Sequence, residues 1–260
     1  MTKQPVTFIL GVLAALALLL PAAGQADEAP PPLSAMWIIT PKEGHDAEFR
    51  KALAEHMAFR SEHGDPRTWE VYTPVLGDEL DRYAIRFCCF NWADQDSYEA
   101  WMDGHSEIRD HLQANLSPHT GKVAHYFESI DWADSHWVDS DTSYRFFAVT
   151  EFNIKPGKGL DFTKARSKMS QIALNQGWAT DSRPWIWASV VGGKPVESII
   201  IPHLNYASFD RGEETFINFL SRQLGEESAA ELVNEFAETA WSTDFQIWAY
   251  QADLSMSKED

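Results

Sequence analysis

The sequence predicts an α+β protein built from two copies of one unit, each with the order strand, helix, strand, strand, helix, strand. Two observations carry this prediction. Four segments of the first half recur in the same order in the second half. Between them, apolar and aromatic runs typical of strands alternate with segments in which apolar residues recur at helical spacing.

The first element is an N-terminus with the composition of a secretory signal peptide. Lys3 precedes an apolar run at residues 8–20, which is shorter than the roughly 20 residues that a membrane-spanning helix needs. Small residues then lead to Ala26, where we expect cleavage. Residues 1–26 are therefore predicted to be a signal peptide, and the mature protein to be periplasmic or secreted without membrane attachment. An uncleaved N-terminal anchor is the alternative.

Internal matches define the two copies, which follow a short Pro-rich segment at 27–33. The separation of the matching segments along the chain is nearly constant, which chance similarity would not produce. We expect a first repeat at 34–138, a linker at 139–142 and a second repeat at 143–256. The matching segments are 40–52 with 154–165, 67–71 with 183–187, 87–93 with 201–207, and 96–99 with 210–213.

Each repeat contains four predicted strands and two predicted helices. We expect the second helix to open with an Asp-x-x-Glu capping box, at Asp96 in the first repeat and at Asp210 in the second. In the first repeat, strands are expected at 35–40, 68–75, 82–92 and 124–130, and the first helix at 45–63. In the second repeat, strands are expected at 146–152, 185–191, 197–206 and 245–252, and the first helix at 160–176.

The third strand of each repeat is apolar almost without interruption, so both faces of the sheet need to be covered. The helices of a repeat can cover one face, and the sheet of the other repeat can cover the second. In this element order, in the Asn-aromatic-Ala at Asn91 and Asn205, and in the capped second helix, the chain resembles the dimeric α+β barrel superfamily. That ferredoxin-like fold is shared by antibiotic-biosynthesis-type monooxygenases, stress-responsive barrel proteins and chlorite-dismutase-type haem proteins. The resemblance covers most of the mature chain and implies a single-chain, pseudo-dimeric α+β barrel with a ligand pocket between the sheet and the helices of one repeat.

Polar residues on the expected core-facing side of the helices place this pocket in the first repeat. His56, Arg60 and His63 follow Phe49 at helical spacing, and His105 on the second helix falls opposite Phe219 of the second repeat. Burying imidazole or guanidinium groups is costly unless they are satisfied or useful. We therefore predict His56 and His105 as catalytic residues. The predicted substrate-binding residues are Arg60, His63, Trp69 and Asn91.

Each of these residues also has a structural interpretation. For His56 this is a core histidine bonded to a carbonyl, which occurs more often than a catalytic one. The cations Arg60 and His63 are explained by the dipole at a helix C-terminus. Asn91 recurs as Asn205 and Trp69 as Trp185, which favours a turn cap and a packing role. The second repeat is expected to be mainly structural.

The function expected from this pattern is binding of a small hydrophobic or aromatic molecule in the first repeat, without a cofactor. One alternative is a cofactor-independent monooxygenase acting on an aromatic or quinol substrate, with His56 or His105 as the base, Arg60 or Asn91 holding an oxyanion, and Trp69 packing on the substrate. A second alternative is haem binding through His105 or His56. No other metal site is expected, because the sequence lacks spacings such as His-Glu-x-x-His.

Charge and cysteine content restrict the partners. Acidic side chains number 39 against 21 basic ones, and no Lys/Arg cluster exists, so nucleic acid is not an expected partner. Cys88 and Cys89 are neighbours on a predicted strand, where successive side chains point to opposite faces. We therefore expect two small buried residues, and a vicinal disulfide acting as a redox element is the alternative. Further association of two chains through a free sheet edge is left open.

Overall fold

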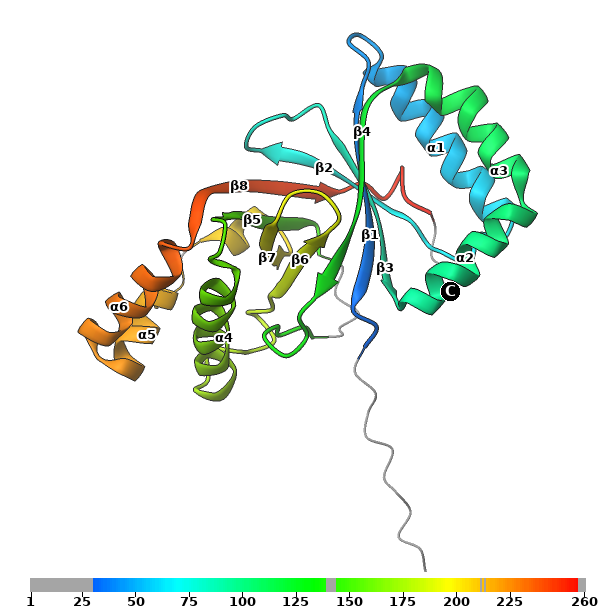
Figure 1. Cartoon of the computed structure of the whole chain (residues 1–260). Coiled ribbons are helices and arrows are strands. Elements are labelled where there is room, and N and C mark those ends of the chain that lie inside the picture. The colour runs from blue at the N-terminus through cyan, green and yellow to red at the C-terminus, as the bar shows by residue number, and fades with distance from the viewer. Residues whose placement is uncertain (1–29, 139–143, 211, 213, 257–260) are drawn as a thin grey trace, which may run out of the picture.

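The computed structural model describes residues 30–138, 144–210, 212 and 214–256 (Figure 1). The predicted signal peptide and the predicted linker at 139–142 lie outside the described residues. Within the described part, no helix is both long enough and apolar enough to cross a membrane.

The same order of strands and helices occurs in the two halves of the chain. The first half contains β1 (Leu33–Pro41), α1 (Asp46–Glu62), β2 (Glu70–Leu76), β3 (Tyr83–Phe90), α2 (Trp92–Gly104), α3 (Ser106–His111) and β4 (Thr120–Ile130). Short π and 3-10 turns at Leu112–Leu116 and Ser117–His119 connect α3 to β4. The second half contains β5 (Phe146–Ile154), α4 (Gly159–Asn175), β6 (Ile186–Val191), β7 (Val196–His203), α5 (Phe216–Leu224), α6 (Glu226–Ala237) and β8 (Ala240–Tyr250).

The eight described strands form one closed antiparallel barrel in the order β1-β3-β2-β8-β5-β7-β6-β4. The halves join at two seams, β2 with β8 and β4 with β6, where Tyr72 lies opposite Tyr250 and Phe127 opposite Val191. Every described strand has a neighbour on both sides, so the free sheet edge considered for association of two chains does not exist among them.

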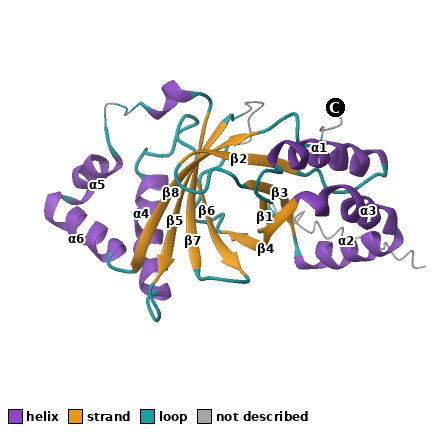
Figure 2. Cartoon of the chain, turned by 90° about the horizontal axis from the view of Figure 1, so that it is seen from above, coloured by secondary structure: helices purple, strands orange, loops and turns teal. Residues whose placement is uncertain are grey.

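Helices lie outside the barrel on two opposite sides of it (Figure 2). Figure 2 shows α1, α2 and α3 on one side of the strands and α4, α5 and α6 on the other. The outer face of β1 and α1 form the first core, with Phe49 and Leu53 fully buried. In the second half, Phe162 of α4 packs with Trp187 of β6 and with Trp185, which directly precedes β6. The barrel interior is therefore a separate compartment, enclosed by strands from both halves.

The C-terminal residues after β8 belong to the core of the first half. The Gln251 amide donates to the Val71 carbonyl, and the Met256 amide donates to the Trp69 carbonyl. Leu254 is 2 % exposed and packs in the same cluster as α1.

The predicted capping boxes are displaced. α2 begins at Trp92, five residues before the expected start, and the Asn91 amide donates to Asp94 Oδ2 at 2.8 Å, so Asp96 lies inside the helix. In the second half, Asn205 caps only the 3-10 turn Tyr206–Phe209. The α5 helix begins at Phe216 with Thr215 as its cap, and Glu213 lies outside the described residues. The earlier Asn-x-x-Asp competes with Asp-x-x-Glu for the helix start, because both patterns satisfy the free amides of a first turn.

Candidate functional site

A cavity of about 410 Å³ lies inside the barrel, and every strand contributes to its lining. This volume falls within the range of small-molecule sites, roughly 300–1,000 Å³. The lining follows from strand alternation: on β1, Ala35 and Ile39 face α1, whereas Met36 and Ile38 face the cavity. A strand that is apolar almost without interruption therefore faces two interiors, the core under the helices on one side and the barrel cavity on the other.

Aromatic and aliphatic side chains make up most of the wall. They come from both halves of the chain, and from the loop after β4. They are Met36, Ile38, Tyr72, Ala84, Tyr126, Ile130, Trp132, Trp137, Phe147, Val149, Ile186, Ala188, Ile200 and Trp248.

Five charged residues also line the cavity, and four of them come from the first half. Glu70 on β2 lies directly opposite Arg86 on β3, and its carboxylate accepts a hydrogen bond from the Tyr72 hydroxyl at 2.7 Å. Glu128 on β4 accepts from the Ser34 hydroxyl at 2.9 Å. Arg82, the fourth, donates to Gln246 and pairs with Glu79.

Glu151 is the charged residue that the second half contributes to the cavity wall. Burial raises the pKa of its carboxyl group, and the nearby charge of Glu128 adds to this effect. Burial likewise raises the pKa of the Tyr126 hydroxyl, and it raises that of the Tyr72 hydroxyl well above its usual value. Both phenols are therefore neutral hydroxyl groups in the physiological range, and Glu151 takes up a proton more readily than an exposed glutamate.

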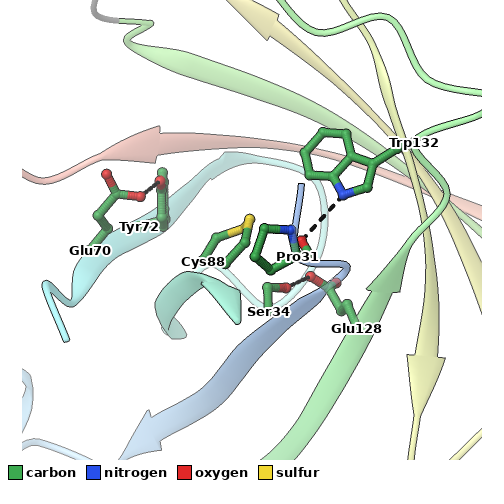
Figure 3. Close-up of a disulfide and its surroundings, with 8 residues drawn as sticks. Pro31, Ser34, Glu70, Tyr72, Cys88, Glu128 and Trp132 are labelled. Atoms are coloured by element: carbon green, nitrogen blue, oxygen red, sulfur yellow. Dashed lines mark hydrogen bonds between the residues drawn. A yellow bond between two sulfur atoms is a disulfide. The ribbon is translucent and has the colours of Figure 1, made fainter. Parts of the chain in front are cut away.

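A disulfide between Cys88 and Cys89 forms part of the cavity wall (Figure 3). The prediction of two separate buried cysteines is therefore wrong, and the reason is a β-bulge. Leu33 of β1 lies opposite Phe90 and Ser34 lies opposite Cys88, so Cys89 is an extra residue without a partner in β1. Strand alternation is interrupted at such a residue, and this lets both cysteines line one cavity. The peptide bond between the two cysteines is cis.

Ser34 connects the disulfide to a carboxylate. It lies opposite Cys88 on one side and opposite Glu128 on the other, so the three residues form a row across β3, β1 and β4. Figure 3 shows this row together with Trp132, whose indole N–H donates to the Pro31 carbonyl at 3.2 Å. The disulfide thus faces a polar, aromatic part of the cavity.

The six residues predicted for the site lie elsewhere, on the helix side of the first sheet or at helix ends. His56 and Arg60 are buried as expected, at 2 % and 8 % exposure. Arg60 pairs with Asp65 at 2.6 Å, and the Trp69 indole donates to the same carboxylate at 3.1 Å. Tyr98 accepts a further hydrogen bond from Arg60. The structure thus brings His56, Arg60 and Trp69 into one polar cluster whose members satisfy each other.

The other three predicted residues do not join this cluster. His63 and His105 each bond through Nδ1 to a carbonyl one turn earlier, Phe59 and Trp101 respectively, both at 2.7 Å. Asn91 is exposed at the start of α2. The expected second-helix stripe containing His105 is also interrupted, because α2 ends at Gly104 and α3 starts at Ser106.

Haem coordination through the predicted histidines does not fit the residues present. Both ring nitrogens of His56 are engaged, Nδ1 with His111 Nδ1 at 3.1 Å and Nε2 with Arg60 at 3.4 Å. Burial, with the charges of Arg60 and His111, lowers the pKa of His56 to about 3, so its ring is neutral. His105 lies outside the cavity and stacks on Trp101, and no histidine lines the cavity. Among the described residues, no group of three or more His, Cys, Asp or Glu side chains could hold a metal ion.

The cavity residues can be recognised in the sequence as charged residues within predicted strands, a pattern that a search for helical spacing does not detect. Arg86 and Glu151 each interrupt a strand that is otherwise rich in apolar residues, and Glu128 follows the aromatic pair Tyr126 and Phe127. A charged side chain in such a strand indicates either an exposed face or an interior polar site. Because the helices cover the other face, these positions identify the barrel interior.

Solved structures share this fold, although the sequence matches no protein-family model and no curated protein. A "putative monooxygenase" from Lactobacillus acidophilus is 11% identical with a TM-score of 0.52, over 85% of this chain and 94% of that chain. An anthrone oxidase-like protein is 10% identical with a TM-score of 0.50, over 88% and 95%. A mutant chlorite dismutase from Candidatus Nitrospira defluvii is 8% identical with a TM-score of 0.51, over 85% and 92%. These are dimeric α+β barrel proteins, so the predicted α+β fold is confirmed at the level of the barrel and its helices.

Proposed function

We propose that this protein binds a small molecule with an aromatic or apolar body and a few polar substituents in the central barrel cavity. The observation that supports this best is the cavity of about 410 Å³ with an aromatic wall and five charged side chains. Carboxylates and guanidinium groups are costly to enclose in a barrel that only has to fold. The site is thus proposed between the halves, and not under the helices of the first half.

The wall indicates how such a ligand would be held. Trp132 and Tyr126 offer flat apolar surfaces, and neutral phenols can donate hydrogen bonds. Glu70 and Glu128 can accept from hydroxyl or amine groups, and Arg86 can donate to carbonyl or acidic groups. The ligand class that fits is a compact aromatic molecule carrying both donors and acceptors.

We also propose that the two halves are tandem repeats forming an intrachain pseudo-dimer. Support comes from the recurring sequence segments, from the common order of elements, and from the two seams that close the barrel. The halves contribute unequally, because the disulfide and four of the five charged lining residues belong to the first half. In this proposal the first half supplies most of the recognition chemistry.

Binding of N-phenyl-1-naphthylamine, a neutral aromatic amine with environment-sensitive fluorescence, tests the site. Ala188→Phe places a ring in the cavity, and we expect it to weaken binding at least about tenfold, equivalent to about 1.4 kcal/mol. The matched control Ala47→Phe makes the same change at an exposed position of α1 and should bind normally. Failure of the unmodified protein to bind the probe, or loss of binding in His56→Phe with retention in Ala188→Phe, would overturn the proposal. Native mass spectrometry of the protein purified from its own compartment would report the mass of a retained ligand.

A monooxygenase acting on an aromatic or quinol substrate is the second candidate. Two neighbours are named as monooxygenases, and a third as anthrone oxidase-like. In this chain the base would be Glu151, whose pKa is raised by burial within the cavity, in place of His56 or His105. Oxygen consumption with anthrone or a hydroquinone, lost in Glu151→Gln, would support this activity. Absence of oxygen consumption alongside tight binding would leave the binding function.

We further propose export with cleavage after Ala26, supported by the composition of residues 1–26. An exported protein also meets the oxidising conditions in which a disulfide persists. N-terminal sequencing of the mature protein tests the site of cleavage, and an intact Met1 would contradict it.

A further inference from the structure

The Cys88–Cys89 disulfide contributes little to holding the fold together. A disulfide stabilises a protein mainly by restricting the unfolded chain, and its effect grows with the length of the loop that it closes. Here the bond joins adjacent residues, so the loop is as short as a chain permits. The bond must therefore be explained by its location and chemistry.

Its location is the wall of the cavity, within reach of small molecules. Both cysteines are half-buried, whereas the neighbouring Ile85 and Phe90 are buried. Cys89 sits at the β-bulge and has no partner in β1, so the pairing of β3 with β1 is interrupted at this residue. No other cysteine exists in the chain to exchange with these two.

We propose that the Cys88–Cys89 pair is a thiol-responsive switch that sets the affinity of the central cavity for its ligand. This rests on the proposed binding function. The reductant is a small thiol: two thiol groups lose their protons and two electrons and leave joined as one disulfide. The Cys88–Cys89 bond breaks, and each cysteine sulfur takes up one electron and one proton.

Reduction changes the cavity in two ways. The single compact S–S surface becomes two S–H groups, which are weak donors and lie in the part of the cavity that holds Glu70 and Glu128. Without the bond between neighbours, the side chain of Cys89, which has no partner in β1, is also free to rotate away from Cys88. A wall shaped for the ligand in the oxidised state is thereby lost, so the oxidised form binds more tightly.

The switch predicts that probe binding and reduction of the disulfide affect each other, and both effects can be measured. Reduced protein should bind N-phenyl-1-naphthylamine at least about fivefold more weakly than oxidised protein, and the probe should make the disulfide harder to reduce by the same factor. Dithiothreitol is the reductant, and native alkylation by iodoacetamide followed by mass measurement counts the free thiols. Reoxidation with oxidised glutathione should restore the affinity.

The control is the double variant Cys88→Ser, Cys89→Ser. It should bind the probe with the affinity of the reduced protein, and dithiothreitol should not change that affinity. The switch would be overturned if oxidised and reduced protein bound the probe with equal affinity. It would also be overturned if dithiothreitol failed to reduce the disulfide in the folded protein. Either result would leave the binding function intact. Absence of probe binding in both redox states would overturn the two proposals together. Should the double variant fail to fold by circular dichroism, the comparison of oxidised with reduced unmodified protein decides alone.

Discussion

His56 gives the sharpest prediction about stability, because its ring is buried, neutral and next to a cation. The side chain lies on α1 at 2 % exposure, with Arg60 and His111 as its neighbours. Burial is the main cause that lowers its pKa from 6.5 to about 3. Protonation of this imidazole therefore favours the unfolded chain, in which the ring is solvated.

The size and direction of the effect follow from the two pKa values. The folded pKa lies below the unfolded one, so stability is lost as the pH falls below 6.5 and the loss stops growing near pH 3. One pKa unit corresponds to about 1.4 kcal/mol, so acidification from about pH 7 to about pH 5 should lower the free energy of unfolding by about 2 kcal/mol through His56 alone. His56→Phe should abolish that part of the pH dependence.

Urea unfolding at both pH values, followed by tryptophan fluorescence, measures this difference for the unmodified protein and for His56→Phe. Leu53→Ala is the matched control, since it removes a fully buried, uncharged side chain one turn earlier on α1. It should cost about 2–5 kcal/mol at both pH values and leave the pH dependence unchanged. An equal acid-induced loss of stability in His56→Phe and the unmodified protein would refute the reasoning.

Two further predictions concern stability. Gly121→Ala should lower the free energy of unfolding by about 1–3 kcal/mol, because its Cβ would lie 2.8 and 2.9 Å from two backbone carbonyl oxygens of β1. Gly104, at the end of α2, has open space around it, so Gly104→Ala should be neutral or stabilising by up to about 1 kcal/mol. Equal urea midpoints for Gly121→Ala and Gly104→Ala would contradict the β1–β4 register. Asp134→Ala should cost about 3 kcal/mol in urea unfolding, because it removes a buried partner of the 3 % exposed Arg166 side chain. Asp103 forms an exposed ion pair with Arg109, so Asp103→Ala should cost less than about 1 kcal/mol. A similar loss of stability in both variants would show that burial does not determine how much an ion pair contributes.

The order of strands and helices was predictable because it depends on local periodicity, which each segment carries by itself. The location of the cavity was not, because strands such as β3 are apolar on both faces and their pattern does not tell which face encloses a ligand. Helical spacing identified His56 and Arg60 as buried, and this is correct. It could not show that Asp65, from the loop after α1, satisfies Arg60 within a closed cluster.

The disulfide was only the alternative expectation, for a related reason. Regular alternation separates Cys88 from Cys89, and only the register against β1 reveals the extra residue that brings them together. That register is set by strand partners distant in the sequence, which a local pattern does not contain.

The chain end that follows β8 has a consequence for how the protein is made. Leu254 and Met256 fill the core around α1, and their segment bonds to the backbone of β2 and the loop before it. The N-terminal half, although synthesised first, lacks these contacts until residues 251–256 have been synthesised. We therefore expect that it does not fold as an autonomous unit, and that removal of residues 251–256 unfolds the N-terminal half, to whose core Leu254 and Met256 belong.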